Sequence, residues 1–119
     1  MHINDEVVGV GVDIVEFSRI KNIRFLDRFA EYFLTPAEIM ACEASADRVS
    51  FLASRFAAKE ATIKAFPTLL KPHDFEIIKE GKGPAVRFAS VENENKYRAF
   101  VSITHSTEYA AGYATVTKK

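Results

Sequence analysis

The spacing of apolar residues changes character along this chain of 119 residues. Residues 7–14 read Val-Val-Gly-Val-Gly-Val-Asp-Ile, which is typical of a buried strand that carries both glycines and Asp13 on one face. Residues 16–66 repeat apolar side chains at helical spacing, and after residue 74 apolar and polar positions alternate. This order predicts one strand, several helices and then a largely antiparallel sheet, which defines an α+β fold.

Capping signals place the ends of the predicted helices. Residues 16–33 form short helical pieces. A capping box opens the next helix at Thr35, and this helix runs to about Ala44. The long helix starts near residue 46 or 47 and ends at Phe66, because the proline that follows cannot continue it.

Four strands are predicted in the second half of the chain, over residues 75–79, 84–88, 97–104 and 109–116. Residues 80–83, Glu-Gly-Lys-Gly, supply a turn between the first two. We expect a mostly antiparallel sheet packed against the long central helix. No repeat, low-complexity tract or linker divides the sequence, so residues 1–119 are predicted to form one domain.

The long helix carries charge on faces that should be apolar. At about 100° per residue, Lys59 falls on the face of the large apolar residues, so we expect its side chain to be sequestered. That face consists of Leu52, Phe56, Ile63 and Phe66. A second face contains only small residues, namely Ala53, Ala57, Ala58, Ala61 and Ala65, and Glu60 lies at the seam between the two faces. Packing the alanine face on Gly9 and Gly11 of the first strand would bring Asp13 towards Glu60.

Two interpretations of these charges remain open. Burying an unpaired carboxylate or ammonium costs several kcal/mol, so such groups persist when they are paired, hydrogen-bonded or bound to a metal. Lys59 and Glu60 could belong to a structural ion-pair network, or Lys59 could extend its ammonium to the surface. Alternatively, both belong to a reactive site.

Charge and composition limit the classes of function. Sixteen basic and sixteen acidic residues give zero net charge, which argues against a protein that coats nucleic acid. The sole cysteine, Cys42, is expected to be a small buried apolar residue in a reducing compartment. No signal sequence is recognisable and no apolar run approaches the ~20 residues of a membrane span, so a soluble cytoplasmic protein is predicted. The small size makes a site shared between subunits plausible.

Several common motifs are absent. A Gly-Val-Gly at residues 9–11 begins like a dinucleotide fingerprint, but Ile14 stands where the third glycine belongs, and there is no Walker-type loop. His2, His73 and His105 lack the spacing of metal ligands, and no nucleophile elbow surrounds a serine. The sequence therefore argues against dinucleotide binding and against a serine triad.

The remaining chemistry-bearing groups are two carboxylates, Asp13 and Glu60, and a set of cationic side chains, Arg55, Lys59, Lys64 and His105. Hard oxygen ligands with adjacent cations suit Mg²⁺ bound to a di- or polyphosphate. The plainer alternative is that the cations are solvated charges, that Glu60 and Lys64 form an i,i+4 pair, and that His105 caps the end of a strand.

Three segments carry a family resemblance. They are Gly-Val-Asp-Ile-Val-Glu at residues 11–16, Arg-Phe-Ala-Ala-Lys-Glu-Ala at 55–61 followed by Lys64, and Val-Ser-Ile-Thr-His-Ser at 101–106. Together they resemble the holo-acyl-carrier-protein synthase family, the small 4′-phosphopantetheinyl transferases. Residues 33–38 also look like the family's linking segment, so the resemblance covers most of the chain. The segment at 55–61 is the most specific of the three.

The resemblance implies transfer of the phosphopantetheine arm of coenzyme A to a serine of an acyl carrier protein, with release of 3′,5′-ADP. It implies that Asp13 and Glu60 hold Mg²⁺ against the pyrophosphate. Lys64 would stabilise charge on the transferred or leaving phosphate, which makes Glu60 and Lys64 the expected catalytic residues. Either Glu60 or a metal-bound water would take the serine proton.

The resemblance also implies where the partners bind. Arg55 and His105 would contact the nucleotide end of coenzyme A together with Lys64, and Gly83 and Pro84 resemble the family's turn beside the adenine. A homotrimer with active sites between neighbouring subunits is implied. The acidic carrier protein would dock on a basic first helix, for which the candidates are Arg19, Arg24 and Arg28. A solvated helix face is the alternative for these arginines.

One segment departs from the family pattern. After Phe66 the family usually has a glycine-rich loop near the coenzyme A, whereas residues 67–73 read Pro-Thr-Leu-Leu-Lys-Pro-His. This shorter, stiffer loop supports a second hypothesis, a non-catalytic module that binds carrier protein or coenzyme A on the same fold. Another Mg²⁺-dependent phosphotransferase is a third. Fatty acid biosynthesis is the family's usual setting, but the sequence does not distinguish carriers for fatty-acid, polyketide or peptide synthesis.

Overall fold

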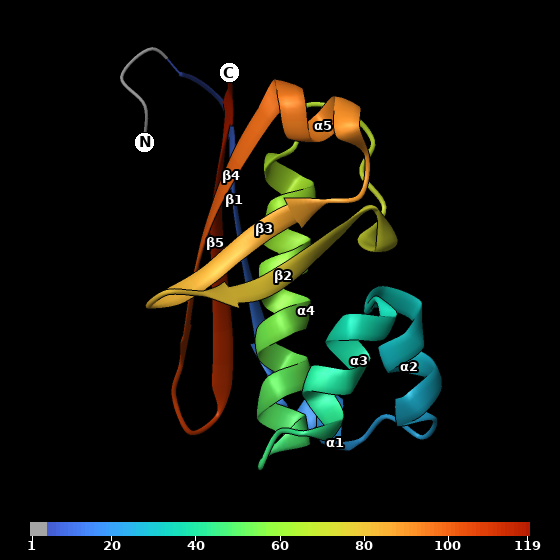
Figure 1. The fold of residues 1–119 in the computed structure, drawn as a ribbon. Coiled ribbons are helices and arrows are strands. Elements are labelled where there is room, and N and C mark those ends of the chain that lie inside the picture. Colours follow the sequence, from blue (N-terminus) through green and yellow to red (C-terminus); the bar gives the residue numbers. More distant parts are fainter. Residues whose placement is uncertain (1–4) are drawn as a thin grey trace.

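The first and last strands of the chain lie side by side in one antiparallel sheet. The structure, a computed structural model, describes residues 5–119, so His2 lies outside the described residues. Strand β1 (Glu6–Glu16) pairs with β5 (Tyr109–Lys118), which also pairs with β4 (Tyr97–His105). The strand order is β1-β5-β4, and β1 and β4 are therefore the two edges of this sheet (Figure 1).

Three short helices gather around the N-terminal end of the long helix α4, which runs along the sheet (Figure 1). The bounds are Phe17–Lys21 for α1, Leu26–Phe33 for α2, Pro36–Glu43 for α3 and Arg48–Ala65 for α4. The predicted capping box is present, because Thr35 and Glu38 each accept a backbone N–H of the other. The Asp47 side chain caps α4, and this helix ends before Phe66. Within residues 5–119, no helix is both long and apolar enough to cross a membrane.

The predicted strands of the second half are confirmed, but they divide between two sheets. Strands β2 (Phe75–Glu80) and β3 (Gly83–Phe88) form a separate antiparallel hairpin that crosses α4 (Figure 1). Gly81 in its turn has a φ of 59°, a conformation that glycine adopts readily. The short helices η1 (Pro72–Asp74) and α5 (Val91–Lys96) were not predicted, because they are too short to produce a periodic signal. The α+β prediction, with a mostly antiparallel sheet against a long central helix, is confirmed.

The alanine face of α4 packs on the glycines of the three-stranded sheet, which the sequence predicts for the glycines of β1 but not for Gly112 of β5. Gly11 of β1 lies against the backbone of Ala61, and Gly112 of β5 lies against that of Ala57. Both alanines are fully buried. The helix backbone therefore approaches the sheet more closely than larger side chains would allow.

Gly112→Ala is expected to destabilise the fold. An added Cβ would lie 2.6 Å from the carbonyl carbon of Ala57 and 2.6 Å from the amide nitrogen of Ala58, so helix or strand must shift. Overpacking of this kind costs about 2 kcal/mol or more, which thermal unfolding would record as a lower Tm. Gly83→Ala is the control, because an added Cβ there meets no atom within 4 Å. An unchanged Tm for Gly112→Ala would contradict this packing.

The opposite face of the three-stranded sheet is apolar and open in the single chain. Val10, Val12 and Ile14 are between 58% and 62% exposed, and Tyr113 on β5 is 48% exposed. The prediction of a buried first strand is therefore correct for only one of its two faces. An exposed apolar patch on a sheet is typical of an interaction surface.

Candidate active site

Asp13, Glu60 and Lys64 meet at the β1 edge of the sheet. Asp13 lies on the face of β1 that looks towards α4, and the other two come from successive turns of α4. The Lys64 ammonium is 3.1 Å from Asp13 Oδ1 and donates to the Val12 carbonyl at 3.1 Å. The Glu60 carboxylate interacts electrostatically with both Asp13 and Lys64. We call Asp13, Glu60 and Lys64 the carboxylate half-site.

The carboxylate half-site carries excess negative charge. Burial raises the pKa of Glu60 above its ordinary value of 4.5, and the charge of Asp13 raises it further, while Lys64 opposes the rise. Two ionised carboxylates beside one ammonium leave a net charge of about −1. An additional cation at this point would stabilise both carboxylates.

The donor set suits a metal ion that is shared with a ligand. Within residues 5–119, no three His, Cys, Asp or Glu side chains are grouped closely enough to hold a metal by themselves. Mg²⁺ commonly takes one or two carboxylates from the protein and fills its other positions with water and phosphate oxygens. Asp13 and Glu60 therefore fit a Mg²⁺ ion that also binds a phosphate ligand.

Arg55 lies in a separate pocket of about 200 Å³ between α4, the β2–β3 hairpin and β4. The residues that line it are Arg55, Ile78, Lys79, Gly83, Pro84 and Ile103. The structure thus brings together Arg55, Gly83 and Pro84, which the family resemblance assigns to one ligand. It adds Lys79, a cation on β2 whose only sequence signal is its place just before a glycine turn. We call Arg55, Lys79, Gly83 and Pro84 the arginine half-site.

The Arg55 guanidinium has an unmet hydrogen-bonding demand. Among the described residues, its Nε is a buried side-chain nitrogen without a hydrogen-bond partner. Burial lowers the pKa of the guanidinium, and the charge of Glu38 opposes this effect. A buried donor without a partner beside a second cation is suited to an anionic ligand such as a phosphate.

The two half-sites lie on opposite sides of α4. Arg55 and Lys64 differ by nine positions, which corresponds to about 180° around a helix. Lys64 bonds to β1, one edge of the sheet, whereas the pocket of Arg55 includes Ile103 of β4, the other edge. The two half-sites therefore face opposite edges of the sheet.

His105, the other residue assigned to the nucleotide end, is the last residue of β4 and is exposed. Its ring centroid lies 6.5 Å from that of Phe17 at the start of α1. It therefore lies on the same edge strand as Ile103, which lines the pocket of Arg55, but His105 itself is not among the residues that line that pocket.

The three arginines assigned to carrier docking are exposed, but they do not share one helix. Arg19 is on α1, Arg24 is in the turn that follows, and Arg28 is on α2. The prediction of a single basic first helix is wrong in this respect, because the chain turns after Lys21. The guanidinium carbons of Arg24 and Arg28 each lie 5.3 Å from the ring centroid of Phe25, which is 57% exposed.

Lys59 belongs to neither half-site. Its side chain is 1% exposed, and its ammonium donates to Glu38 Oε1 at 2.6 Å and to the Phe75 carbonyl at 3.0 Å. The predicted sequestration of Lys59 is confirmed, and Lys59 does belong to a structural ion pair, but its partner is Glu38 and not Glu60. The alternative of a lysine that extends its ammonium to the surface is wrong. The sequence identified Glu38 only as part of a capping box, and no local signal reveals a partner 21 residues away.

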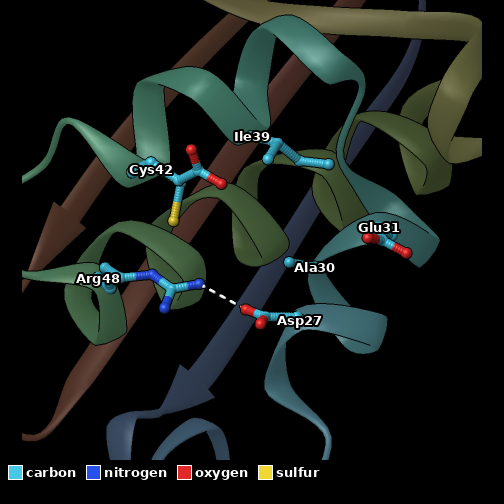
Figure 2. A pocket seen from close by; sticks show the side chains of 7 residues that line it. Asp27, Ala30, Glu31, Ile39, Cys42 and Arg48 are labelled. Atoms are coloured by element: carbon cyan, nitrogen blue, oxygen red, sulfur yellow. Dashed lines mark hydrogen bonds and ion pairs between the residues drawn. The ribbon is translucent and has the colours of Figure 1, made fainter.

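A larger cavity between α2, α3 and the start of α4 contains none of the predicted site residues. Its volume is about 470 Å³, and it is lined by Asp27, Ala30, Glu31, Ile39, Cys42, Glu43 and Arg48. Figure 2 shows Arg48 bonded to Asp27, at 2.9 Å, with the sulfur of Cys42 nearby. Cys42 is 2% exposed, as expected for a small buried apolar residue. The arginine of this cavity is already paired, so the cavity does not present a free anion site.

Comparison with known proteins defines the class to which this fold and site belong. Residues 9–114 match the ACPS family model, which describes the 4′-phosphopantetheinyl transferase superfamily. The matched range includes every residue of both half-sites, and the class is therefore that of the 4′-phosphopantetheinyl transferases.

Individual relatives narrow the class. The holo-[acyl-carrier-protein] synthase of Koribacter versatilis is 40% identical over 116 residues, which cover 87% of this chain and 93% of the relative. The crystal structure of the Bacillus anthracis holo-(acyl-carrier-protein) synthase in complex with CoA (3′,5′-ADP) is 31% identical, with a TM-score of 0.78 and coverage of 95% and 98%. The Helicobacter pylori enzyme in complex with coenzyme A is 33% identical, with a TM-score of 0.77 and coverage of 90% and 98%. The chain belongs to the holo-[acyl-carrier-protein] synthase family, which confirms the resemblance seen in the motifs.

Proposed function

We propose that this protein transfers the 4′-phosphopantetheine arm of coenzyme A to a serine of an apo acyl carrier protein in a Mg²⁺-dependent reaction that releases 3′,5′-ADP. The observation that carries the proposal is the convergence of Asp13, Glu60 and Lys64 from β1 and α4. The names of the relatives, and the coenzyme A bound to two of them, support the choice of substrates. One domain, residues 1–119, would carry the activity.

Asp13 and Glu60 would hold the Mg²⁺ ion, which when bound neutralises charge on the pyrophosphate. The raised pKa of Glu60 supports this role, because part of the rise comes from the neighbouring Asp13 charge that a cation would offset. The Lys64 side chain is 53% exposed, so it is free to turn from Asp13 to a phosphate oxygen. Asp13 and Glu60, through Mg²⁺, and Lys64, directly, would bind the pyrophosphate from one side.

In the transfer step, the serine oxygen bonds to the phosphorus that carries the pantetheine arm. The bond from this phosphorus to the bridging oxygen breaks, and that oxygen leaves with 3′,5′-ADP. Lys64 would stabilise the negative charge that develops on the phosphate groups. The serine proton must also leave, and either the Glu60 carboxylate or a water molecule at this site would accept it.

The arginine half-site would bind the nucleotide end of coenzyme A, together with His105. The unpaired Nε of Arg55 and the nearby Lys79 supply the donors that a phosphate requires. Gly83 and Pro84 would line the path of the adenine.

We further propose a homotrimer in which neighbouring subunits complete each active site. The position of the two half-sites on opposite sides of α4 supports this arrangement. In such a ring, the β1 edge of one subunit would meet the β4 edge of the next, and each interface would combine one half-site of each kind. The apolar outer face of the sheet, with Val10, Val12, Ile14 and Tyr113, supplies surface that such an assembly would bury.

The carrier protein would dock on Arg19, Arg24 and Arg28, whose exposure suits an acidic partner. Fatty acid biosynthesis is the proposed setting, and the cytoplasm the proposed location, in keeping with the single cysteine.

In the glycine-free loop after α4, Leu70 is 3% exposed and Leu69 is 84% exposed. Leu69 therefore gives this loop a free apolar side chain.

Intact-mass spectrometry tests the proposed function. Apo carrier protein is incubated with the enzyme, coenzyme A and Mg²⁺, and a mass increase equal to one phosphopantetheine group on the carrier is expected. Binding of coenzyme A or carrier without a mass increase would favour a non-catalytic module. Turnover of nucleotides without carrier protein would favour a different phosphotransferase.

A further inference from the structure

One buried ion pair joins three elements of the fold. The side chains of Lys59 on α4 and Glu38 on α3 are 1% and 2% exposed, and their charged atoms are 2.6 Å apart. Glu38 Oε2 accepts the backbone N–H of Ile77 at 2.9 Å, and Lys59 donates to the carbonyl of Phe75 at 3.0 Å. Lys59 also lies 4.8 Å from the ring centroid of Phe75. Both partners of the pair therefore bond to the beginning of β2.

The β2–β3 hairpin depends on side-chain ties of this kind, by which we mean hydrogen bonds between side chains of other elements and β2. It shares no backbone ladder with the three-stranded sheet, and a two-stranded hairpin by itself is only marginally stable. A second tie runs from the Thr35 hydroxyl to Glu76 Oε2 at 2.6 Å, and Arg87 binds the other oxygen of Glu76 at 3.0 Å. This second tie is partly exposed, whereas the Lys59–Glu38 pair is fully buried.

The same hairpin forms one wall of the arginine half-site. Gly83 and Pro84 begin β3, and Lys79 lies near the end of β2. Arg55 precedes Lys59 by one turn of α4 and lies on the same side of that helix. The position of the hairpin relative to α4 therefore sets the distance between Arg55 and the glycine-proline turn.

Lys59 offers no free position to a reacting group. Its ammonium already contacts two acceptors and the face of an aromatic ring. Burial lowers the pKa of Lys59, and the charge of Glu38 opposes this effect. Moving the ammonium to a phosphate would leave the Glu38 carboxylate buried and unpaired, which is strongly unfavourable.

We propose that Lys59 is a positioning residue whose ion pair with Glu38 fixes the β2–β3 hairpin against α4 and thereby sets the affinity for coenzyme A, without taking part in bond making. The identity of the ligand rests on the proposed function. The fixing of the hairpin rests only on the contacts of Lys59 and Glu38.

Two variants test the proposal. Lys59→Met leaves a buried carboxylate unpaired, so its Tm is expected to fall by roughly 10 °C or more. The rate of hydrogen exchange of the Ile77 amide should rise about tenfold. The KM for coenzyme A should also rise about tenfold, while kcat stays within about threefold of the wild type. The double variant Glu38→Gln/Lys59→Met removes both charges and should recover at least about half of the lost Tm. Its KM for coenzyme A should remain raised, because the hydrogen bond from Lys59 to the Phe75 carbonyl is not restored.

Lys96→Met is the matched control. Lys96 pairs with Glu92 on the exposed helix α5, and the two side chains are 55% and 74% exposed. Its Tm, Ile77 exchange, KM and kcat should match those of the wild type, because exposed pairs of this kind contribute little. The control separates loss of any lysine from loss of the buried tie.

Three outcomes would overturn the proposal. A folded double variant with kcat reduced about 100-fold or more and KM unchanged would assign Lys59 to the chemistry. Loss of one limb of the kcat–pH profile in that variant would do the same. Wild-type exchange of Ile77 and wild-type KM in both variants would remove the positioning role. If Lys59→Met does not fold, the double variant carries the test.

Failure of this proposal can be distinguished from failure of the proposed function. A wild-type protein that binds coenzyme A without modifying carrier protein overturns the function. The dissociation constants of coenzyme A, measured by calorimetry across the variants, then replace KM as the test of positioning. A wild-type protein that does not bind coenzyme A overturns the link to affinity, whatever Ile77 exchange reports about the hairpin.

Discussion

Glu60→Gln is expected to lower kcat for carrier modification by at least about 10³-fold while the fold persists. The amide keeps the size of the side chain but loses the negative charge that would hold Mg²⁺ beside Asp13. Adding Mg²⁺ to the complex with coenzyme A should raise the Tm of the wild type further and should not raise that of the variant. Glu92→Gln, on an exposed carboxylate of α5, is the matched control and should retain full activity.

The stability of Glu60→Gln is expected to depend on pH differently from that of the wild type. Burial and Asp13 raise the pKa of Glu60 in the folded chain above its ordinary value of 4.5. The folded state therefore favours the protonated acid, and stability falls as the pH rises from the unfolded pKa through the folded pKa. Glutamine has no such dependence, so the variant should be as stable as the wild type or more stable at about pH 8, with a smaller difference at about pH 4. An inactive variant with a much lower Tm than the wild type at about pH 8 would indicate misfolding instead of loss of a carboxylate that holds Mg²⁺.

Mixed oligomers of two inactive variants are expected to regain activity. Glu60→Gln damages the carboxylate half-site, and Arg55→Gln damages the arginine half-site. If each active site takes one half-site from each of two neighbouring chains, random mixing leaves about a quarter of the interfaces with both halves intact. Each variant alone should show less than about 1% of wild-type activity, and the refolded mixture should approach about 25%.

A second mixture controls for unspecific recovery. Asp13→Asn and Glu60→Gln damage the same half-site, so their mixture should remain inactive. Native mass spectrometry of both mixtures should give three times the chain mass of 13.3 kDa. Mixed trimers of Glu60→Gln and Arg55→Gln chains without activity would contradict active sites between subunits.

The secondary structure was largely predictable because its signals are local. The capping box at Thr35, the stop before Pro67 and the glycine turn at residues 80–83 each depend on neighbours within a few positions. The alternation after residue 74 identified four strands, but it did not reveal that two of them form a separate hairpin. Strand partners are chosen by packing over long sequence distances, which periodicity does not encode.

The candidate site was predictable in part. Alanines and glycines with matching faces implied that Asp13 approaches the α4 segment of Glu60, because small residues permit close contact of helix and strand. The sequence did not reveal that Arg55 and Lys64 serve opposite edges of the sheet. That conclusion requires both the angular positions of Arg55 and Lys64 around α4 and the order of the strands in the sheet.

Sequence alone determined the α+β class, the element order, the position of Lys59 on an apolar face of the long helix and the motifs that identify the family. Tertiary structure alone decided that Lys59 pairs with Glu38, that β2 and β3 stand apart, and that the two half-sites face away from each other. The division has a physical reason. Helix caps, turns and apolar periodicity act between near neighbours in the chain, whereas the partner of a buried charge is whichever group the packed fold brings within reach.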